Sequence, residues 1–216
     1  MANVWIDLTH EIDETTLVYP GDPQVEISPK NQRMKDDFSL RQIHTAMHVG
    51  THLDAPSHYL KDGNDVESIP LERFLGIANV IHIKPDQGLI RTKDLQHAWE
   101  TLPKTDKLLL DTSHATKFNT TEYFSQCPSF EPSLFDFLHE QGIRLIGLDL
   151  PTVQYQNVGP AKAHEDLLSD GIVIVEGLNK LDQLSNTVFF GCPPLKIKGM
   201  DGSMVRAFAL VDSSLL

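Results

Sequence analysis

IRLIGLDLPTVQYQNVGPAKAHEDLLSDGIVIVEGL, residues 143–178, is the stretch that decides the fold class. Two short runs rich in Ile, Leu and Val, at 143–152 and 172–178, predict buried strands. Between them, residues 161–171 have the pattern of a helix that ends where the chain reverses at Asp170 and Gly171. Strand, helix and strand in this order are typical of an α/β protein.

The segments on either side continue this alternation. Residues 39–52 are expected to be extended, and helices are predicted at 92–102 and 132–142. Further strands are predicted at 4–9, 77–84, 106–113, 187–193, 195–199 and 203–211. Because strands follow one another at both ends of the chain, we expect one mixed sheet. A chain of 216 residues is long enough for one hydrophobic core and short for two, so residues 1–216 are expected to form a single domain.

The composition narrows the expected partners and location. The net charge of -12 opposes nucleic-acid binding, because Lys and Arg dominate phosphate contacts, so a small-molecule substrate is expected. No run approaches the ~18 apolar residues of a membrane span and the first residues lack a secretory pattern, which predicts a cytoplasmic protein without membrane association. Cys127 and Cys192 are too few and too isolated for a disulfide framework, so we expect reduced thiols.

Residues 48–59, HVGTHLDAPSHY, concentrate three histidines and an aspartate. His48, His52 and Asp54 are separated by even intervals, so they share a face in an extended segment, and the two histidines share one even in a helix. Two imidazoles and a carboxylate suit zinc, manganese or iron(II); the alternative is a set of surface or hydrogen-bonded core histidines. His58 follows Pro56, and an imidazole left free beside a metal-bound water is suited to acid/base catalysis; the alternative is a surface or helix-start histidine.

His164 and Glu176 form a second candidate pair within the opening stretch. Glu176 shares a strand face with Ile172 and Ile174, where a carboxylate is costly unless it is paired or binds a metal. The helix after His164 rises roughly 9 Å and the strand returns roughly 13 Å, so the two residues can meet. The alternatives are an ion pair for Glu176 and a solvated helix end for His164. Together with the first three candidates they make more protein ligands than one zinc ion usually binds. Two divalent metals per chain are therefore predicted, with zinc ahead of manganese.

The remaining candidates carry weaker signals. Six histidines lack partners at ligand spacing and are expected to be structural: His10, His44, His82, His97, His114 and His139. Asp149 ends an apolar run and lies either beside the site or at the turn before Pro151. No nucleophile elbow, phosphate-binding glycine loop or Cys/His pair is evident, so covalent catalysis is not indicated.

The stretch HVGTHLDAPSH resembles the HxGTHxDxPxH signature of the cyclase-like metal-dependent hydrolases, the family that contains bacterial kynurenine formamidase and isatin hydrolase. The segments IDLTHEID, VYPGDP, GLDLPTV and GMDGSMVRAFAL also look like their counterparts in that family. The resemblance implies a swivelling β/β/α fold, a homodimer or tetramer, and His58 as proton donor and acceptor. It also implies a binuclear centre bridged by Asp54, with the metal ligands His48, His52, Asp54, His164 and Glu176.

Departures from the family pattern bear on the substrate. Kynurenine formamidases carry a tryptophan before the Pro-Gly-Asp turn, packed against the aromatic substrate; Tyr19 stands there in this chain and is the predicted substrate-binding residue. They also tend to have Ser and Asp at the places of Thr152 and Gln154. We predict a hydrolase that cleaves a small amide, an arylformamide such as N-formylkynurenine or a related cyclic amide, by metal-activated water. A lactam, lactone or isatin-type hydrolase is the alternative.

Two functions of other classes use the same residues. An iron(II) oxygenase needs only a His/His/Asp set with open positions, and the pair His164 and Glu176 favours hydrolysis because an oxygenase has no evident need for it. A noncatalytic metal-binding protein is the second, and the unliganded His58 favours an enzyme.

Overall fold

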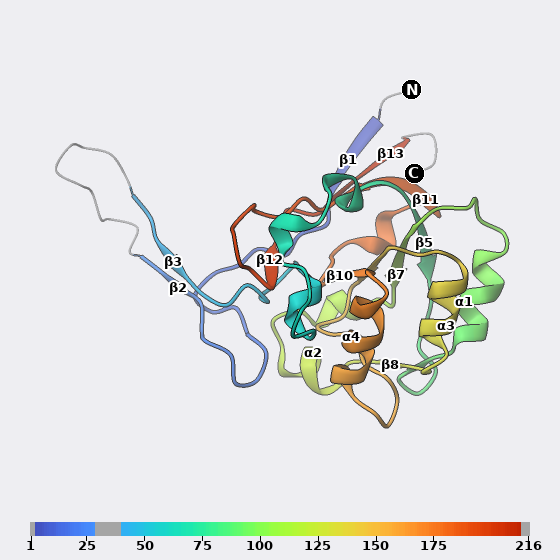
Figure 1. Ribbon diagram of the computed structural model, residues 1–216, viewed down its shortest axis with the longest axis horizontal. Helices are drawn as coiled ribbons and strands as arrows, with labels where there is room; N and C mark the ends of the chain where they lie inside the picture. Colours follow the sequence, from blue (N-terminus) through green and yellow to red (C-terminus); the bar gives the residue numbers. More distant parts are fainter. Residues whose placement is uncertain (1–2, 29–39, 213–216) are drawn as a thin grey trace.

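The structure is a computed structural model that describes residues 3–28 and 40–212; Ser39, the first residue of the extended segment predicted at 39–52, lies outside them. Nine strands form one large curled sheet in the order β1-β13-β11-β5-β7-β9-β10-β4-β12 (Figure 1). These strands are β1 (Asn3–Asp7), β4 (His52–Asp54), β5 (Leu75–His82), β7 (Lys107–Asp111), β9 (Leu145–Leu148), β10 (Val173–Glu176), β11 (Thr187–Gly191), β12 (Gly202–Met204) and β13 (Phe208–Asp212).

In the described part of the chain, four helices and several short elements complete the fold. The α-helices are α1 (Thr92–Trp99), α2 (Thr121–Ser125), α3 (Leu134–Glu140) and α4 (Pro160–Ser169). The short strands are β2 (Glu26–Ile27), β3 (Ile43–His44), β6 (Leu89–Ile90) and β8 (Ser129–Phe130). The 3-10 turns are η1 (Pro56–His58), η2 (Val66–Ser68), η3 (Leu71–Phe74), η4 (His114–Lys117) and η5 (Leu181–Gln183). Within the described ranges, no helix has the length and apolar character needed to cross a membrane.

The sheet is parallel in its centre and antiparallel at both sides. Strands β5, β7, β9 and β10 pair in parallel, and the helices that follow β5, β7 and β9 connect them. Strands β1, β13 and β11 add antiparallel to one side, and β4 and β12 to the other. The prediction of a mixed α/β sheet is therefore confirmed.

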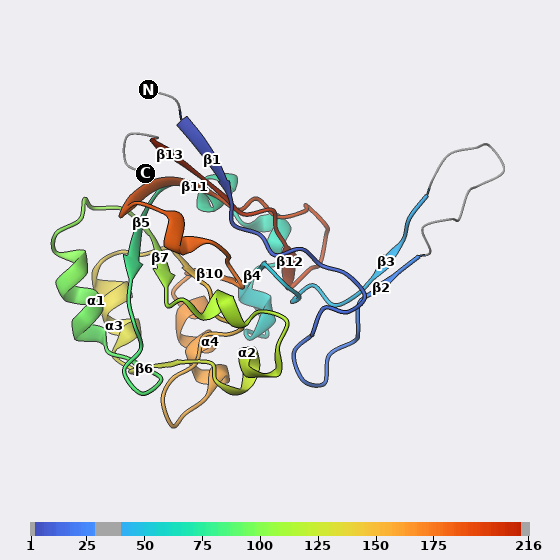
Figure 2. The same cartoon turned by 180° about the vertical axis from the view of Figure 1, so that it is seen from behind.

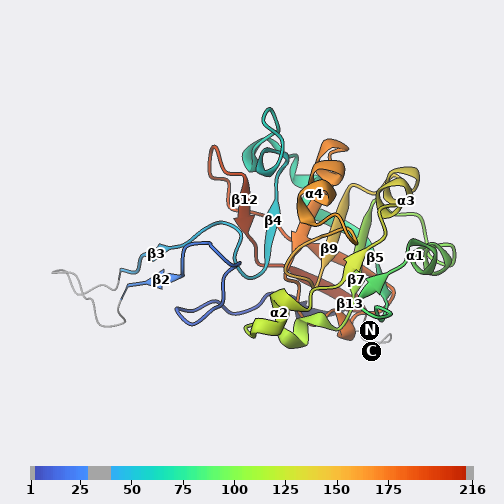
Figure 3. The same cartoon turned by 90° about the horizontal axis from the view of Figure 1, so that it is seen from below.

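Each face of the sheet has its own hydrophobic core. Helices α1, α3 and α4 lie along one face (Figure 3), and their apolar side chains pack with alternate residues of the central strands, such as Leu108, Ile146 and Ile174. The intervening residues, such as Leu109 and Val175, point into the curl of the sheet and meet side chains from β1, β11 and β13. This two-sided burial explains the nearly continuous apolar runs of β7, β9 and β10.

The hairpin strands β2 and β3 extend away from the rest of the protein (Figures 1 and 3). The loop that precedes β2 runs back along the protein beside α2 (Figure 2), where the Leu17 N–H donates to Asn119 Oδ1 at 2.7 Å.

Two sequence expectations need correction, and one helix was not predicted. Residues 195–199 are not a strand: the Ile197 N–H donates to Leu195 O, so the alternating LKIK pattern forms a tight exposed turn without a partner strand. Residues 40–52 contain only the short β3 and the first residue of β4, because the chain bends before Gly50, whose φ is +60°. Helix α2 was not predicted, since five residues are too few to show a helical period.

Candidate metal centre

The six residues predicted for the metal centre come together at one end of the sheet. His52 and Asp54 lie two residues apart on β4, and in the antiparallel pairing with β10 the partner of His52 is Glu176. His164 lies on α4, which precedes β10, and His48 and His58 flank β4 on the bend before it and the turn η1 after it. All six line one cavity of about 430 Å³.

Asp54 lies at the centre of the cluster and is only 1% exposed. Its Oδ1 is 2.8 Å from His48 Nδ1 and 3.6 Å from His52 Nε2. Its Oδ2 is 3.4 Å from His164 Nε2. One carboxylate therefore contacts three imidazoles, the arrangement that a shared ligand between two cations requires.

Glu176 is the second buried carboxylate, at 3% exposure. Its Oε1 is 3.3 Å from His164 Nε2 and accepts the Val153 N–H at 2.9 Å, while its Oε2 is 3.5 Å from His52 Nε2. The backbone hydrogen bond fixes the carboxylate plane without using both oxygens, so Glu176 faces the cluster in one orientation.

Backbone carbonyls orient two of the imidazole rings. His52 Nδ1 donates to Gly50 O at 3.0 Å, and His164 Nδ1 donates to Pro160 O at 2.8 Å. A carbonyl can only accept, so both Nδ1 atoms carry protons and both Nε2 atoms face the carboxylates. Metal-ligating histidines are oriented in this way in proteins.

His58 lies at the edge of the cluster, stacked on His48 with ring centroids 3.9 Å apart. Asp201 joins the two rings: its Oδ2 is 3.2 Å from His58 Nδ1 and 3.1 Å from His48 Nε2. Asp201 was not predicted as a site residue, although it lies in GMDGSMVRAFAL, a segment that carries the family resemblance. His58 also lies within 4.8 Å ligand-atom reach of His48 and Asp54, so its position suits a metal ligand as well as a proton carrier.

The neighbouring carboxylates favour the protonated, positively charged form of His48 and His164. Burial opposes the charge on His48, but hydrogen bonds and charge from Asp54 and Asp201 raise its pKa to about 9. Burial likewise opposes the charge on His164, but Asp54 and Glu176 raise its pKa to about 10. Burial alone would raise the pKa of Asp54, but His164 and His48 hold it well below its usual range. At the more exposed His58, burial lowers the pKa.

The residues present fit a divalent cation. Asp54 Oδ2 is buried and has no hydrogen-bond partner among the described residues, although an unpaired buried carboxylate oxygen is costly. Two ligand sets have donor atoms within 4.8 Å of one another, His48 with Asp54 and His58, and His52 with Asp54 and Glu176. Buried imidazole and carboxylate donors suit zinc, manganese and iron(II), so the cluster is a divalent metal site by its donor set.

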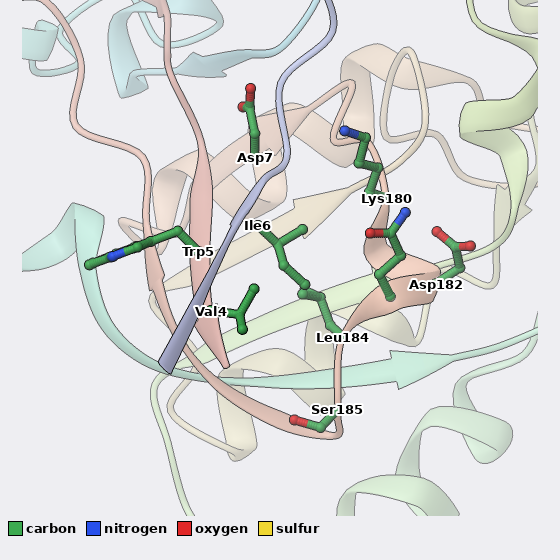
Figure 4. A pocket seen from close by; sticks show the side chains of 9 residues that line it. Val4, Trp5, Ile6, Asp7, Lys180, Asp182, Leu184 and Ser185 are labelled. Carbon is green, nitrogen blue, oxygen red and sulfur yellow. The ribbon is translucent and has the colours of Figure 1, made fainter. Parts of the chain in front are cut away.

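Tyr19 lies at the mouth of the cavity, 43% exposed, and Tyr59 stacks on His164 with ring centroids 4.5 Å apart. A larger hollow of about 730 Å³ between β1 and residues 180–185 has no residue in common with the metal centre (Figure 4). The buried imidazoles and carboxylates of the cluster line the 430 Å³ cavity instead.

The weaker candidates lie outside the cluster. Asp149 is buried and accepts hydrogen bonds from Thr112 N and Oγ1 and from His114 N, so it anchors the turn η4. His82 pairs with Asp111 at 2.8 Å, and His10 stacks on Phe118. His114 is buried, with its Nε2 2.8 Å from Tyr123 O, and the remaining three, His44, His97 and His139, are exposed.

Comparisons with known proteins agree with this geometry. A family model described as "Putative cyclase" matches residues 6–155. The chain is 34% identical over 213 residues to the kynurenine formamidase of Geobacillus thermodenitrificans, covering 96% of this chain and 97% of that protein. It is 29% identical over 204 residues to the kynurenine formamidase of Salinibacter ruber, covering 94% and 95% of the two chains. Isatin hydrolase A from Labrenzia aggregata, solved bound to benzyl benzoate, matches with a TM-score of 0.86 and 26% identity over 97% of this chain and 94% of that chain.

The fold, the buried imidazole and carboxylate donors and these relatives together define a metal-dependent hydrolase of non-peptide C–N bonds. The chain belongs to the cyclase family, which confirms the resemblance carried by residues 48–58.

Proposed function

We propose that the protein hydrolyses N-formyl arylamines, with N-formylkynurenine as the first compound to test. The observation that carries the proposal is the Asp54-centred cluster, in a chain 34% identical to a kynurenine formamidase along almost its whole length. The cavity of about 430 Å³ is within the range of small-molecule sites.

In this proposal His48, His52, Asp54, His164 and Glu176 would hold two divalent ions, zinc ahead of manganese, and Asp54, which belongs to both ligand sets, would serve both. A divalent ion bound here supplies a Lewis acid that polarises the scissile carbonyl and lowers the pKa of water from ~16 toward ~7.

His58 carries the proton in the proposed reaction. Its Nδ1 is tied to Asp201, so the ring keeps one orientation and Nε2 is the atom left to exchange a proton with the leaving nitrogen. Its lowered pKa keeps the ring neutral near pH 7, which is the state that can accept a proton. Tyr19 bounds the cavity on the side where an aromatic substrate would enter.

A cyclic aryl amide is the second candidate substrate, supported by the match to isatin hydrolase A at a TM-score of 0.86. The decisive experiment measures metal content per chain by elemental analysis and then assays N-formylkynurenine, formanilide and isatin on the same reconstituted sample. A content of nearly two zinc or manganese ions per chain, together with formamide turnover, supports the proposal. Turnover of isatin alone would instead indicate that the substrate is a cyclic amide. A single iron with oxygen uptake and no hydrolysis, or metal without turnover, contradicts it in favour of an oxygenase or a binding protein.

We further propose a cytoplasmic homodimer or tetramer. Trp5 on the edge strand β1 and Ile77 on β5, 64% and 50% exposed, offer apolar surface that a second copy could bury. Free Cys127 and buried Cys192 fit a reducing compartment. Light scattering after size exclusion tests the subunit number, and a monomer at micromolar concentration would contradict the proposal.

A further inference from the structure

A second cavity of about 420 Å³ adjoins the metal centre. It lies between the loop before β2, helix α2 and the chain that follows β9. Figure 2 shows that the loop before β2 lies on the side of the protein that carries α2. Tyr19, Pro151 and Thr152 line both this cavity and the one that holds the metal cluster. A substrate whose amide lies at the cluster can therefore place its remaining part in the second cavity, which we call the side cavity.

The side cavity is suited to a flat aromatic group. Apolar and neutral polar side chains line it, among them Leu17, Pro20 and Phe124. Tyr19 and Phe124 meet edge to face, with ring centroids 5.8 Å apart and planes at 90°, so a ring lying flat on one meets the edge of the other. Both are favourable aromatic geometries.

Gln154 supplies the directional polar group of the side cavity. Its Nε2 donates to Cys127 O at 2.9 Å and to Pro128 O at 3.4 Å. Carbonyl oxygens cannot donate, so these two contacts fix which side of the amide carries the NH₂ group. The opposite atom, Oε1, is an acceptor without a hydrogen-bond partner among the described residues, on a side chain that lines the side cavity.

The position of Gln154 relative to the metal centre is also fixed. The neighbouring Val153 N–H holds Glu176 Oε1 at 2.9 Å, and the Phe130 N–H donates to Gln154 O at 2.8 Å. Val153, which binds the Glu176 carboxylate, and Gln154, which carries the acceptor, are thus neighbours in the chain, so one backbone segment held at both residues joins the metal centre to the acceptor.

We infer that the side cavity holds the arylamine part of the substrate and that Gln154 Oε1 selects aryl amides bearing a hydroxyl or amino donor on the ring, with Phe124 stacking on that ring. This inference rests on the proposed function and narrows its substrate class. One neutral hydrogen bond is worth about 0.5–1.5 kcal/mol, which corresponds to roughly 2- to 13-fold in kcat/KM.

The test compares substrates within one enzyme. The N-formyl derivatives of 2-, 3- and 4-aminophenol are assayed against formanilide and the matching N-formylanisidines, and the hydroxyl-to-methoxy ratio of kcat/KM is taken for each ring position. Wild type is expected to favour the hydroxyl compound by roughly fivefold at one position. Gln154→Leu should bring that ratio near one, whereas Gln156→Leu, an exposed glutamine two residues further along, should keep the wild-type ratio.

A ratio is insensitive to the fraction of active protein, so partial misfolding of Gln154→Leu does not obscure the result; Gln154→Met provides a second side chain of similar length. Phe124→Ala should lower kcat/KM for formanilide more than for N-formylethylamine, and Phe135→Ala on α3 is the matched control. A wild type without hydroxyl preference, or one whose preference survives both Gln154 substitutions, overturns the inference while leaving the formamidase proposal intact. A metal-loaded wild type that hydrolyses no formamide overturns both.

Discussion

Replacing Asp54 by Asn should remove most of the stabilisation that added metal gives to the folded protein. Asn keeps the shape of Asp but removes the charge and one of the two carboxylate oxygens. Asp54 contacts three imidazoles within 3.6 Å and belongs to both ligand sets, so no other side chain of the cluster replaces it.

The size of the effect follows from linkage. One metal ion present at about 100 times its Kd stabilises the folded state by about 2.7 kcal/mol. For a chain of this size, 1 kcal/mol shifts Tm by about 2–4 °C, so metal should raise the wild-type Tm by about 5–11 °C. Loss of one partner of a buried charge pair costs about 3 kcal/mol, or roughly 150-fold in Kd. At the same metal concentration the Asp54→Asn protein should then gain only about 0.3 kcal/mol, about 1 °C.

Thermal unfolding followed by circular dichroism, with and without zinc or manganese, measures both shifts, and elemental analysis of the same samples gives the metal content. Asp62→Asn is the matched control, since Asp62 is exposed and outside the cluster. If Asp54→Asn keeps the full metal content and the wild-type shift in Tm, Asp54 is not a shared ligand and the reasoning fails.

Three further predictions concern single residues. His58→Ala should keep the metal-induced shift in Tm while kcat falls about 10²- to 10⁴-fold; an equal loss of metal would instead make His58 a ligand. Asp149→Ala leaves buried backbone N–H groups unpaired and should lower the free energy of unfolding by about 2–4 kcal/mol in urea, with Asp149→Asn losing less; an unchanged midpoint would refute the anchoring role. The hydrogen bond that His82 donates to Asp111 raises the pKa of His82 above its ordinary 6.5. The stabilisation is therefore fully present below the unfolded-state pKa and is lost as pH rises through the higher folded-state pKa. Because the pair is partly exposed it is worth under about 1 kcal/mol, and His82→Asn should reduce stability in mildly acidic buffer but not in alkaline buffer, as urea titrations at both pH values will show.

The central part of the fold could be predicted because its signals are local. The strands β7, β9 and β10 and the helix α4 each have a recognisable pattern of apolar residues in their own sequence. A strand that is buried on both faces has a nearly continuous apolar sequence whatever its position in the sheet. Where a local pattern had no partner strand, as in the LKIK turn at 195–198, the prediction was wrong, because an isolated strand leaves its backbone groups unpaired.

The spacing of the candidate ligands correctly indicated that they lie close together, although only part of the set shares a strand face as the sequence predicted. His52 and Asp54 share a face of β4 as two residues of one strand should. His48 reaches the same centre by a bend instead, since Gly50 adopts a φ of +60° that interrupts the strand. His164 and Glu176 meet because a helix and a strand joined by a short turn must return beside each other.

The sequence by itself determined the residue types of the metal centre and most of the central strands and helices, because metal donors at close spacing and apolar periodicity are properties of short segments. Only the tertiary structure decided that Asp201 joins His48 to His58, and that Tyr19, Phe124 and Gln154 enclose one side cavity. These residues come from segments far apart in the chain, and they meet because β4 pairs between β10 and β12 and the loop before β2 lies against α2. Such pairings follow from the packing of the whole chain, and no local pattern of residues records them.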